Sequence, residues 1–169
     1  MGGGLSNVYI ASSRQLGAGF ALVASGTFAA GTLDFTGLSG NYNYMLVLQI
    51  NGAGAGGATI ELNADSTTTN YYNQYLSFTG AAVSTGASNN NSLLHAENGG
   101  GYWTVDVGID YASHPCYHSK GNVSLSTPIV QEYFGARTAS TATEITEIKV
   151  IQSGTTITGT GKLYRLYNV

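Results

Sequence analysis

Apolar and polar side chains alternate in many short runs along the chain, and Gly, Ser, Thr and Asn separate the runs. Alternation with a period of two residues is typical of β-strands that bury one face. The longest apolar run, YNYMLVLQI at 42–50, predicts a central strand that is buried on both faces. We predict about nine or ten strands, at 20–25, 32–36, 42–50, 58–63, 71–78, 103–110, 122–126, 129–134, 145–152 and 155–167.

The spacing of these strands predicts the fold class. The sequence has no stripe of apolar residues at helical spacing that continues beyond two turns. Many short strands at regular intervals indicate an antiparallel sandwich or barrel. We therefore predict an all-β, antiparallel chain with a single β-sandwich domain at 16–169 and a lead-in arm or linker at 1–15.

Stretches rich in small residues, at 52–57, 80–91 and 99–101, are predicted loops. Long loops on a rigid sandwich often carry binding residues. They can equally be solvated connections, and the sequence leaves both interpretations open.

The composition narrows the class of protein. Only 9% of the residues are charged, against about a quarter in a typical soluble domain, and the net charge is −3. Neither a disordered chain nor a helical bundle with charged outer faces has this composition. The 6 basic residues are scattered and form no basic patch that could bind nucleic-acid phosphates, so we do not expect nucleic-acid binding. The 1 Cys excludes an internal disulfide, and no apolar run is long enough for us to expect insertion into a membrane.

The reactive side chains do not predict an enzyme, and we expect no cofactor. The 9 carboxylates are scattered along the chain. Asp106 and Asp110 share one predicted strand, but strand rise separates them by about 13 Å, which exceeds the carboxylate spacing of glycosidases. Nucleophile-elbow, zinc-protease, P-loop and dinucleotide motifs are all missing from the sequence.

The densest cluster of potential metal ligands is HPCYH, which places His114, Cys116 and His118 at alternate positions. Alternate residues of an extended segment face the same way, and imidazole and thiolate bind Zn, Fe or Cu. Neighbours in this pattern are about 6.6–7 Å apart, so one ion would need convergence of the chain or symmetry copies. The other interpretation is a polar loop with Cys116 tucked inward as a small apolar residue.

Tyrosine is abundant, with 12 residues, many of them near predicted loops. Exposed Tyr and Trp rings stack on sugar faces and donate hydrogen bonds, which suits a neutral glycan or a protein surface. Alternatively, the rings fill the core or a subunit interface. The predicted ligand contacts are Tyr71, Tyr72, Tyr102, Trp103, Tyr111 and Tyr117.

The low charge also bears on assembly. Charged surface keeps monomers soluble, whereas protein interfaces are depleted in Lys, Glu and Asp and enriched in aromatic residues. We therefore expect a homo-oligomer.

Several segments carry a family resemblance: GTLDFTGLSGNYNYMLVL at 31–48, LNAD at 62–65 with NYY at 70–72, ITEIKV at 145–150 and ITGTGKLY at 157–164. Together they resemble the small β-sandwich modules of phage tail fibres and other virion appendages. The resemblance implies a jelly-roll-like sandwich, a homotrimer and a location in the virion. Two departures stand out. Arg165 replaces the Gly that closes the last strand in that group, and His114 and His118 do not form the His-x-His pair that binds metal in some fibre tips.

We therefore expect a non-enzymatic phage virion protein, a trimeric tail-fibre or appendage module that binds a host receptor or glycan. Its partners would be its own copies, other virion proteins and the host surface, and not nucleic acid. The alternative is a capsid decoration (cement) protein with a structural role. A free carbohydrate-binding module is a third interpretation, which the expected oligomer disfavours.

Overall fold

The computed structural model describes residues 19–39, 42–52, 56–96, 100–123, 129–139, 141–154 and 157–167, so the predicted lead-in at 1–15 lies outside the described residues. The described residues form twelve β-strands and a 3₁₀-helix, η1 (Thr68–Asn70). The strands are β1 (Gly19–Thr27), β2 (Thr32–Phe35), β3 (Asn43–Gly52), β4 (Gly56–Leu62), β5 (Tyr71–Thr79), β6 (Ala82–Ser88), β7 (Ser92–Ala96), β8 (Gly101–Ile109), β9 (Pro115–Val123), β10 (Ile129–Arg137), β11 (Ile148–Gly154) and β12 (Ile157–Tyr167).

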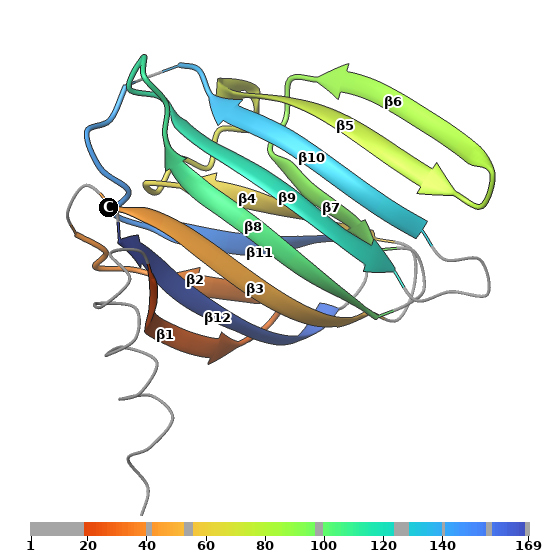
Figure 1. The fold of residues 1–169 in the computed structure, drawn as a ribbon, viewed down its shortest axis with the longest axis horizontal. Helices are drawn as coiled ribbons and strands as arrows, with labels where there is room; N and C mark the ends of the chain where they lie inside the picture. Colours follow the sequence, from red (N-terminus) through yellow and green to blue (C-terminus); the bar gives the residue numbers. More distant parts are fainter. Residues whose placement is uncertain are drawn as a thin grey trace, which may run out of the picture.

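The strands form two antiparallel sheets that pack face to face as a sandwich (Figure 1). The larger sheet has eight strands in the order β1-β12-β3-β8-β9-β10-β5-β6, and the smaller has four in the order β2-β11-β4-β7. In the described part of the chain β1 and β6 are free edges, so the larger sheet is open and is not a barrel. The predicted all-β antiparallel sandwich is confirmed, with twelve strands where nine or ten were expected.

Eight of the strands have jelly-roll connectivity. In one sheet β1, β12, β3 and β8 lie side by side, and β2, β11, β4 and β7 do so in the other. Two hairpins are added to this frame: β5–β6 between β4 and β7, and β9–β10 between β8 and β11. Because β10 pairs with β5, the hairpins together extend the larger sheet beyond the frame. We call the four added strands, β9, β10, β5 and β6, the wing.

The wing is where the predicted strands differ most from the observed ones. Most of β6 lies in the predicted loop at 80–91, and its sequence AVSTGAS alternates weakly because both of its faces are largely exposed. β7 follows directly after that loop and was also missed. The strand predicted at 122–126 is misplaced, since β9 spans Pro115–Val123. Its inward positions include a serine and a glycine, which the apolar pattern does not mark.

Inward-facing side chains of both sheets form one hydrophobic core. The run at 42–50 becomes β3, but this strand is buried on one face only, which corrects the prediction of burial on both faces. Its other face is the outer side of the larger sheet, where Gln49 is exposed. The inward side chains of β3 are Tyr44, Leu46, Leu48 and Ile50.

Two large core rings lie against glycines of the neighbouring strand. Trp103 on β8 pairs with Gly121 on β9, and Tyr117 on β9 pairs with Gly135 on β10. A Cβ atom at Gly121 would overlap the Trp103 indole, and one at Gly135 would overlap the Tyr117 ring. Glycine is therefore required at both positions for the rings to approach the backbone.

A charged cluster fixes the corner between the frame and the wing. The Asp65 carboxylate accepts hydrogen bonds from the Thr67 N–H (3.0 Å) and the Asn70 side-chain amide (3.0 Å). It also pairs with Arg137 at the end of β10, at 2.8 Å. Burial opposes ionisation of Asp65, but the hydrogen bonds from Asn70 and Thr67 and the charge of Arg137 together lower its pKa below 3.8.

We expect Gly121→Ala to lower the free energy of unfolding by about 1–3 kcal/mol, the usual effect of overpacking a core, because the new methyl group meets the Trp103 indole. Equilibrium urea unfolding measures the change. Lys120→Ala is the matched control on the exposed side of the same strand, and its effect should stay within about 0.5 kcal/mol. Equal stability of Gly121→Ala and the wild type would contradict the close approach.

Asp65→Asn should lower the free energy of unfolding at neutral pH by on the order of 1–3 kcal/mol, because the charged acceptor is lost. The folded-state pKa of Asp65 lies below the ordinary value of 3.8. Its stabilising contribution is therefore complete above that pH and is lost as the pH falls through the lower, folded-state pKa. Urea unfolding from neutral to acid pH should show the difference between wild type and variant shrinking only in the acid range. A difference that is already absent at neutral pH would refute the role of the cluster.

Candidate functional site

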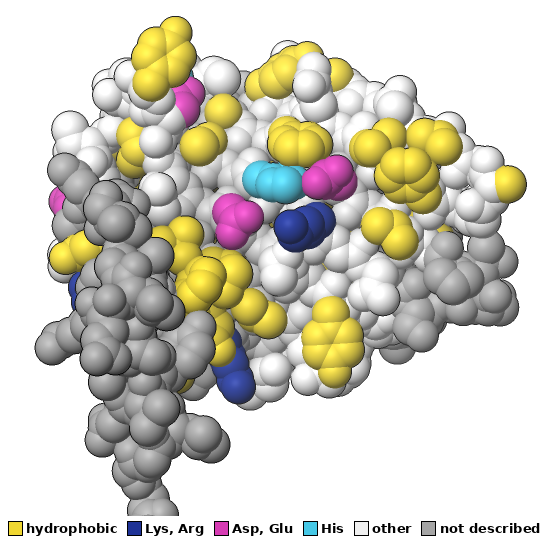
Figure 2. Space-filling view, viewed as in Figure 1, with side chains coloured by type: hydrophobic (Ala, Val, Ile, Leu, Met, Phe, Trp, Pro, Cys, Tyr) yellow, Lys and Arg dark blue, Asp and Glu magenta, His cyan; other side chains and the backbone are white. Residues whose placement is uncertain are grey.

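The outer face of the larger sheet gathers most of the exposed large apolar side chains (Figure 2). Strand alternation presents one side chain from each strand in rows across this face. On a face whose other side chains are polar or charged, such a concentration marks a candidate contact region. Its exposed apolar members are Leu22, Tyr72, Phe78, Val83, Tyr102, Val130 and Phe134.

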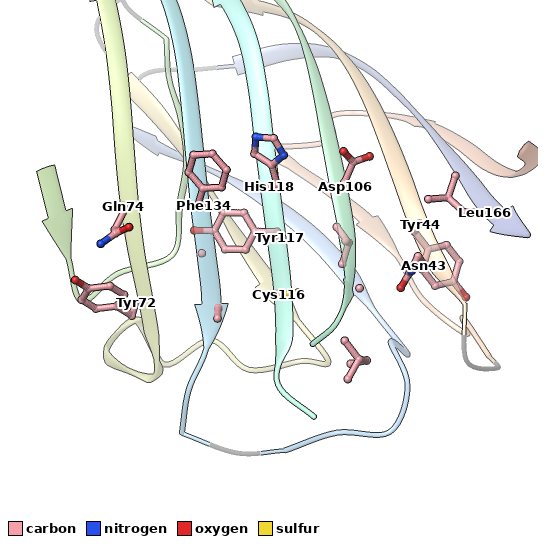
Figure 3. Close-up of a pocket in the computed structure, with 15 residues that line it drawn as sticks. Asn43, Tyr44, Tyr72, Gln74, Asp106, Cys116, Tyr117, His118, Phe134 and Leu166 are labelled. Atoms are coloured by element: carbon pink, nitrogen blue, oxygen red, sulfur yellow. The ribbon is translucent and has the colours of Figure 1, made fainter. Parts of the chain in front are cut away.

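A groove of about 610 Å³ crosses this face where the frame meets the wing (Figure 3). Its floor is a row of small residues, Gly108, Cys116 and Ala136, which are successive cross-strand partners on β8, β9 and β10. Larger side chains continue the same row at each end, with Asn43 on β3 next to Gly108 and Tyr72 on β5 next to Ala136. The groove exists because small side chains lie between large ones in one row of the sheet.

The neighbouring row forms the long wall of the groove. Asp106, His118, Phe134 and Gln74 are successive partners on β8, β9, β10 and β5. The His118 ring stacks on the Phe134 ring, with centroids 4.4 Å apart and an angle of 7° between the planes. The Nε2 atom of His118 lies 2.7 Å from Oε1 of Glu132. These contacts hold the wall in a fixed arrangement before any ligand arrives.

Two aromatic rings are available to a ligand in this groove. Tyr72 is 43% exposed and Phe134 is 47% exposed, and both project from the outer face of the wing. Exposed flat rings on a rigid support bind apolar faces of a ligand with a low loss of side-chain entropy. The amides of Gln74 on β5 and Asn43 on β3 and the carboxylate of Asp106 on β8 supply hydrogen-bonding groups.

The groove does not present an activated nucleophile at Cys116. Burial raises the pKa of this thiol, and the nearby charge of Asp110 raises it further. The thiol is therefore protonated at neutral pH, and a protonated thiol is a poor nucleophile and a poor metal ligand. The arrangement suits non-covalent binding.

Three of the predicted ligand contacts lie in the core. Tyr71, Trp103 and Tyr117 are 1%, 1% and 3% exposed, because each occupies an inward position of its strand. The Tyr71 hydroxyl accepts from the Leu62 N–H (2.9 Å), and the Tyr117 hydroxyl donates to the Ser92 carbonyl (2.7 Å). Desolvation raises the pKa of Tyr71 to about 12 and also raises that of Tyr117. Burial gives these three residues a core role, and of the three only Tyr117 also borders the groove.

The other three predicted contacts are exposed, but the structure does not bring them together. Tyr72 forms one end of the groove. Tyr102 lies on the outer face of β8, two rows beyond the Asp106 wall. Tyr111 is fully exposed in the turn between β8 and β9. Of these three residues, only Tyr72 therefore lines the groove.

The predicted metal cluster is divided between two carboxylate partners. His114 lies in the turn before β9, where its Nδ1 atom is 3.4 Å from Oδ2 of Asp110, whereas His118 contacts Glu132. Cys116 and His118 both face outward, as alternation predicts. Within the described ranges, no three His, Cys, Asp or Glu side chains form a group that could hold a metal ion.

The groove residues that the sequence did not reveal are Asn43, Gln74, Asp106 and Phe134. Each lies at an outward position of a strand that was predicted, so alternation alone could have placed it on a surface. The sequence pattern does not predict that β10 pairs with β5 and that β8 pairs with β9. This pairing brings these positions into two adjacent rows.

No family model, curated protein or solved structure matches the chain. The part of the chain that the structure describes contains no helix able to cross a membrane. The functional assignment therefore depends on the groove and on the residues that form it.

Proposed function

We propose that the chain is a non-enzymatic virion protein of phage type, a trimeric module of a tail fibre or similar appendage that attaches to a receptor or glycan on the host surface. Attachment takes place in the groove on the outer face of the larger sheet. The observation that carries the proposal is the groove itself, in which exposed rings and hydrogen-bonding side chains share one rigid surface.

The chemistry of the groove supports recognition of a hydroxyl-rich ligand. Tyr72 and Phe134 offer ring faces on which a sugar ring or an aromatic side chain can stack. Gln74 and Asn43 both donate and accept hydrogen bonds, and Asp106 accepts them. Small floor residues let a ligand lie close to the backbone of β8 to β10.

The connectivity of the frame supports the location in a virion. Jelly rolls recur in viral capsid and lectin domains, which fits the resemblance of 31–48 and 157–164 to phage appendage modules. A fold does not define a function by itself. The groove is therefore the feature that an experiment must address.

A second surface supports contact with other proteins. Val130, Phe78 and Val83 are cross-strand partners at the edge of the wing and are 51%, 40% and 59% exposed. We call these three residues the apolar strip. With only 9% charged residues in the chain, the strip suits burial against a copy of the chain, as in a trimer. It also favours the second candidate function, a capsid decoration protein that binds the virion shell.

Tyr72→Ala and Phe134→Ala should each weaken binding of the labelled protein to host cells or to a glycan array by about tenfold, since stacking of one ring contributes roughly 1–1.5 kcal/mol. Tyr102→Ala is the matched control, because Tyr102 is an exposed ring on the outer face of β8 that lies outside both the groove and the apolar strip. Thermal unfolding of each variant shows whether the fold is intact. Retention of full binding by both groove variants would refute attachment through the groove. Binding to capsids and not to cells, lost in Val83→Lys, would favour the decoration function instead.

Size-exclusion chromatography with light scattering should give about three times the chain mass of 17.5 kDa. The physical reason is that a chain with so little charged surface is expected to bury part of its exterior against its own copies. Val130→Lys places a charge in the apolar strip and should shift the mass toward the monomer, whereas Thr104→Lys on the outer face of β8 should not. A monomer at micromolar concentration would exclude the trimer.

A further inference from the structure

A second cavity lies on the opposite face of the wing, under the hairpin β5–β6. The smaller sheet ends at β7, and β5 and β6 extend beyond it, as Figure 1 shows at the upper right. Within the described ranges, the inward face of this hairpin therefore has no second sheet against it, and a cavity of about 400 Å³ opens there. This volume is within the range of small-molecule sites. Its described lining residues are Asn73, Tyr75, Ser77, Thr79, Ser84, Ser88, Asn90, Ser92, Ile129, Gln131 and Tyr133.

The described part of the lining is polar and carries no carboxylate, ammonium, guanidinium or imidazole group. Eight of the eleven described lining residues are Ser, Thr, Asn or Gln, and two of the others are Tyr. Hydroxyl and amide groups both donate and accept hydrogen bonds, as sugar hydroxyls do. A charged ligand would find no counter-charge among these residues. The chemistry therefore favours an uncharged ligand with many hydroxyl groups.

The hydroxyls and an amide are arranged in an ordered row. Gln131 on β10, Ser77 on β5 and Ser84 on β6 are successive cross-strand partners, and all face the cavity. Neighbouring strands are about 4.8 Å apart, so the row offers a hydrogen-bonding group at each step across the sheet. Neither Ser77 nor Ser84 has a side-chain hydrogen bond to the part of the chain that the structure describes.

The wall opposite this row is preformed by hydrogen bonds of one buried amide, that of Asn73. Asn73 is 1% exposed, and its Nδ2 atom donates to Oδ1 of Asn90 at 2.6 Å and to the Ser92 carbonyl at 3.3 Å. Its Oδ1 atom accepts from the Ser88 hydroxyl at 2.9 Å. This network holds β5, β6 and the start of β7 at fixed separations. A preformed wall lowers the entropy that a ligand loses on binding.

Two tyrosine rings complete the site. Tyr75 and Tyr133 are cross-strand partners whose ring centroids are 5.8 Å apart at an angle of 30°. The Tyr75 ring lies against Gly86 on β6, where a Cβ atom would be 2.5 Å from the ring. Tyr133 is buried in the core, at 7% exposed, and supports the partly buried Tyr75 ring, which lies beside the polar row and can contact the C–H face of a sugar.

We infer that this cavity binds an uncharged saccharide of one or two sugar rings. The polar row and the Asn73 network provide the hydrogen bonds, and the Tyr75 ring, supported by Tyr133, provides the stacking surface. The site faces the opposite way from the groove and shares none of its lining residues. The inference therefore does not depend on the proposed function of the groove.

The test uses the full chain and an array of neutral oligosaccharides, with sialylated and sulfated ones alongside. Titration of the neutral sugars that bind, by saturation-transfer NMR, gives their affinities. Ser84→Arg places a long side chain in the cavity from an exposed position, so the fold is expected to persist, and it should weaken neutral-sugar binding at least about tenfold. Thr85→Arg is the matched control, because it puts the same side chain on the other face of β6. Ser77→Ala, a smaller change, should weaken binding several-fold.

The inference is overturned if no neutral sugar on the array binds, if binding is unchanged in both Ser84→Arg and Ser77→Ala, or if only charged sugars bind. Tyr72→Ala separates the two sites. If neutral-sugar binding is lost in Ser84→Arg and kept in Tyr72→Ala, the saccharide binds in the cavity. This result supports the inference even if the groove variants show no effect on binding to host cells. Sugar binding that is lost in Tyr72→Ala and kept in Ser84→Arg places the saccharide in the groove and overturns the inference.

Discussion

The larger sheet depends on the close packing of large core rings against glycines on the next strand. Trp103 over Gly121 and Tyr117 over Gly135 place two rings across the junction of β8, β9 and β10. A glycine lets the ring approach the backbone, so the ring fills the space under two strands at once. The wing is joined to the frame by the pairing of β8 with β9, by the Trp103–Gly121 contact and by the charged corner at Asp65. Both candidate sites use strands that this packing holds in place.

The two candidate sites follow from how the wing is attached. A jelly-roll frame with two added hairpins gives one sheet that is wider than the other. On the outer side, the wing continues the face of the frame, and a row of small residues leaves a groove at the junction. On the inner side, the wing extends past β7 and needs polar residues where a complete sandwich would have apolar ones. Inserted segments on a rigid frame are a common location for binding sites.

The sequence revealed the strands of the frame better than those of the wing, for a physical reason. Frame strands bury one face against a second sheet, so their alternation is strong, as in β3 and β8. β6 buries neither face fully, so its pattern is weak. The same rule explains the mixed outcome for the aromatic residues. Consecutive residues of a strand face opposite ways, so only one of Tyr71 and Tyr72 can be on the exposed face. The sequence alone does not show which face of this strand is buried, so it cannot predict which tyrosine is exposed.

The distribution of charge distinguishes the surface suited to binding a ligand from the surface suited to contact with another protein subunit. The chain has 15 charged residues, yet Asp106, Lys120 and Glu132 lie close together around His118 on the outer face of β8, β9 and β10 (Figure 2). Burying such a group against a dry subunit interface would cost free energy unless each charge found a partner. A hydrated ligand can be bound beside these charges without removing their water. The centre of this face is therefore better suited to a polar ligand, and the apolar strip at the wing edge is better suited to another protein subunit.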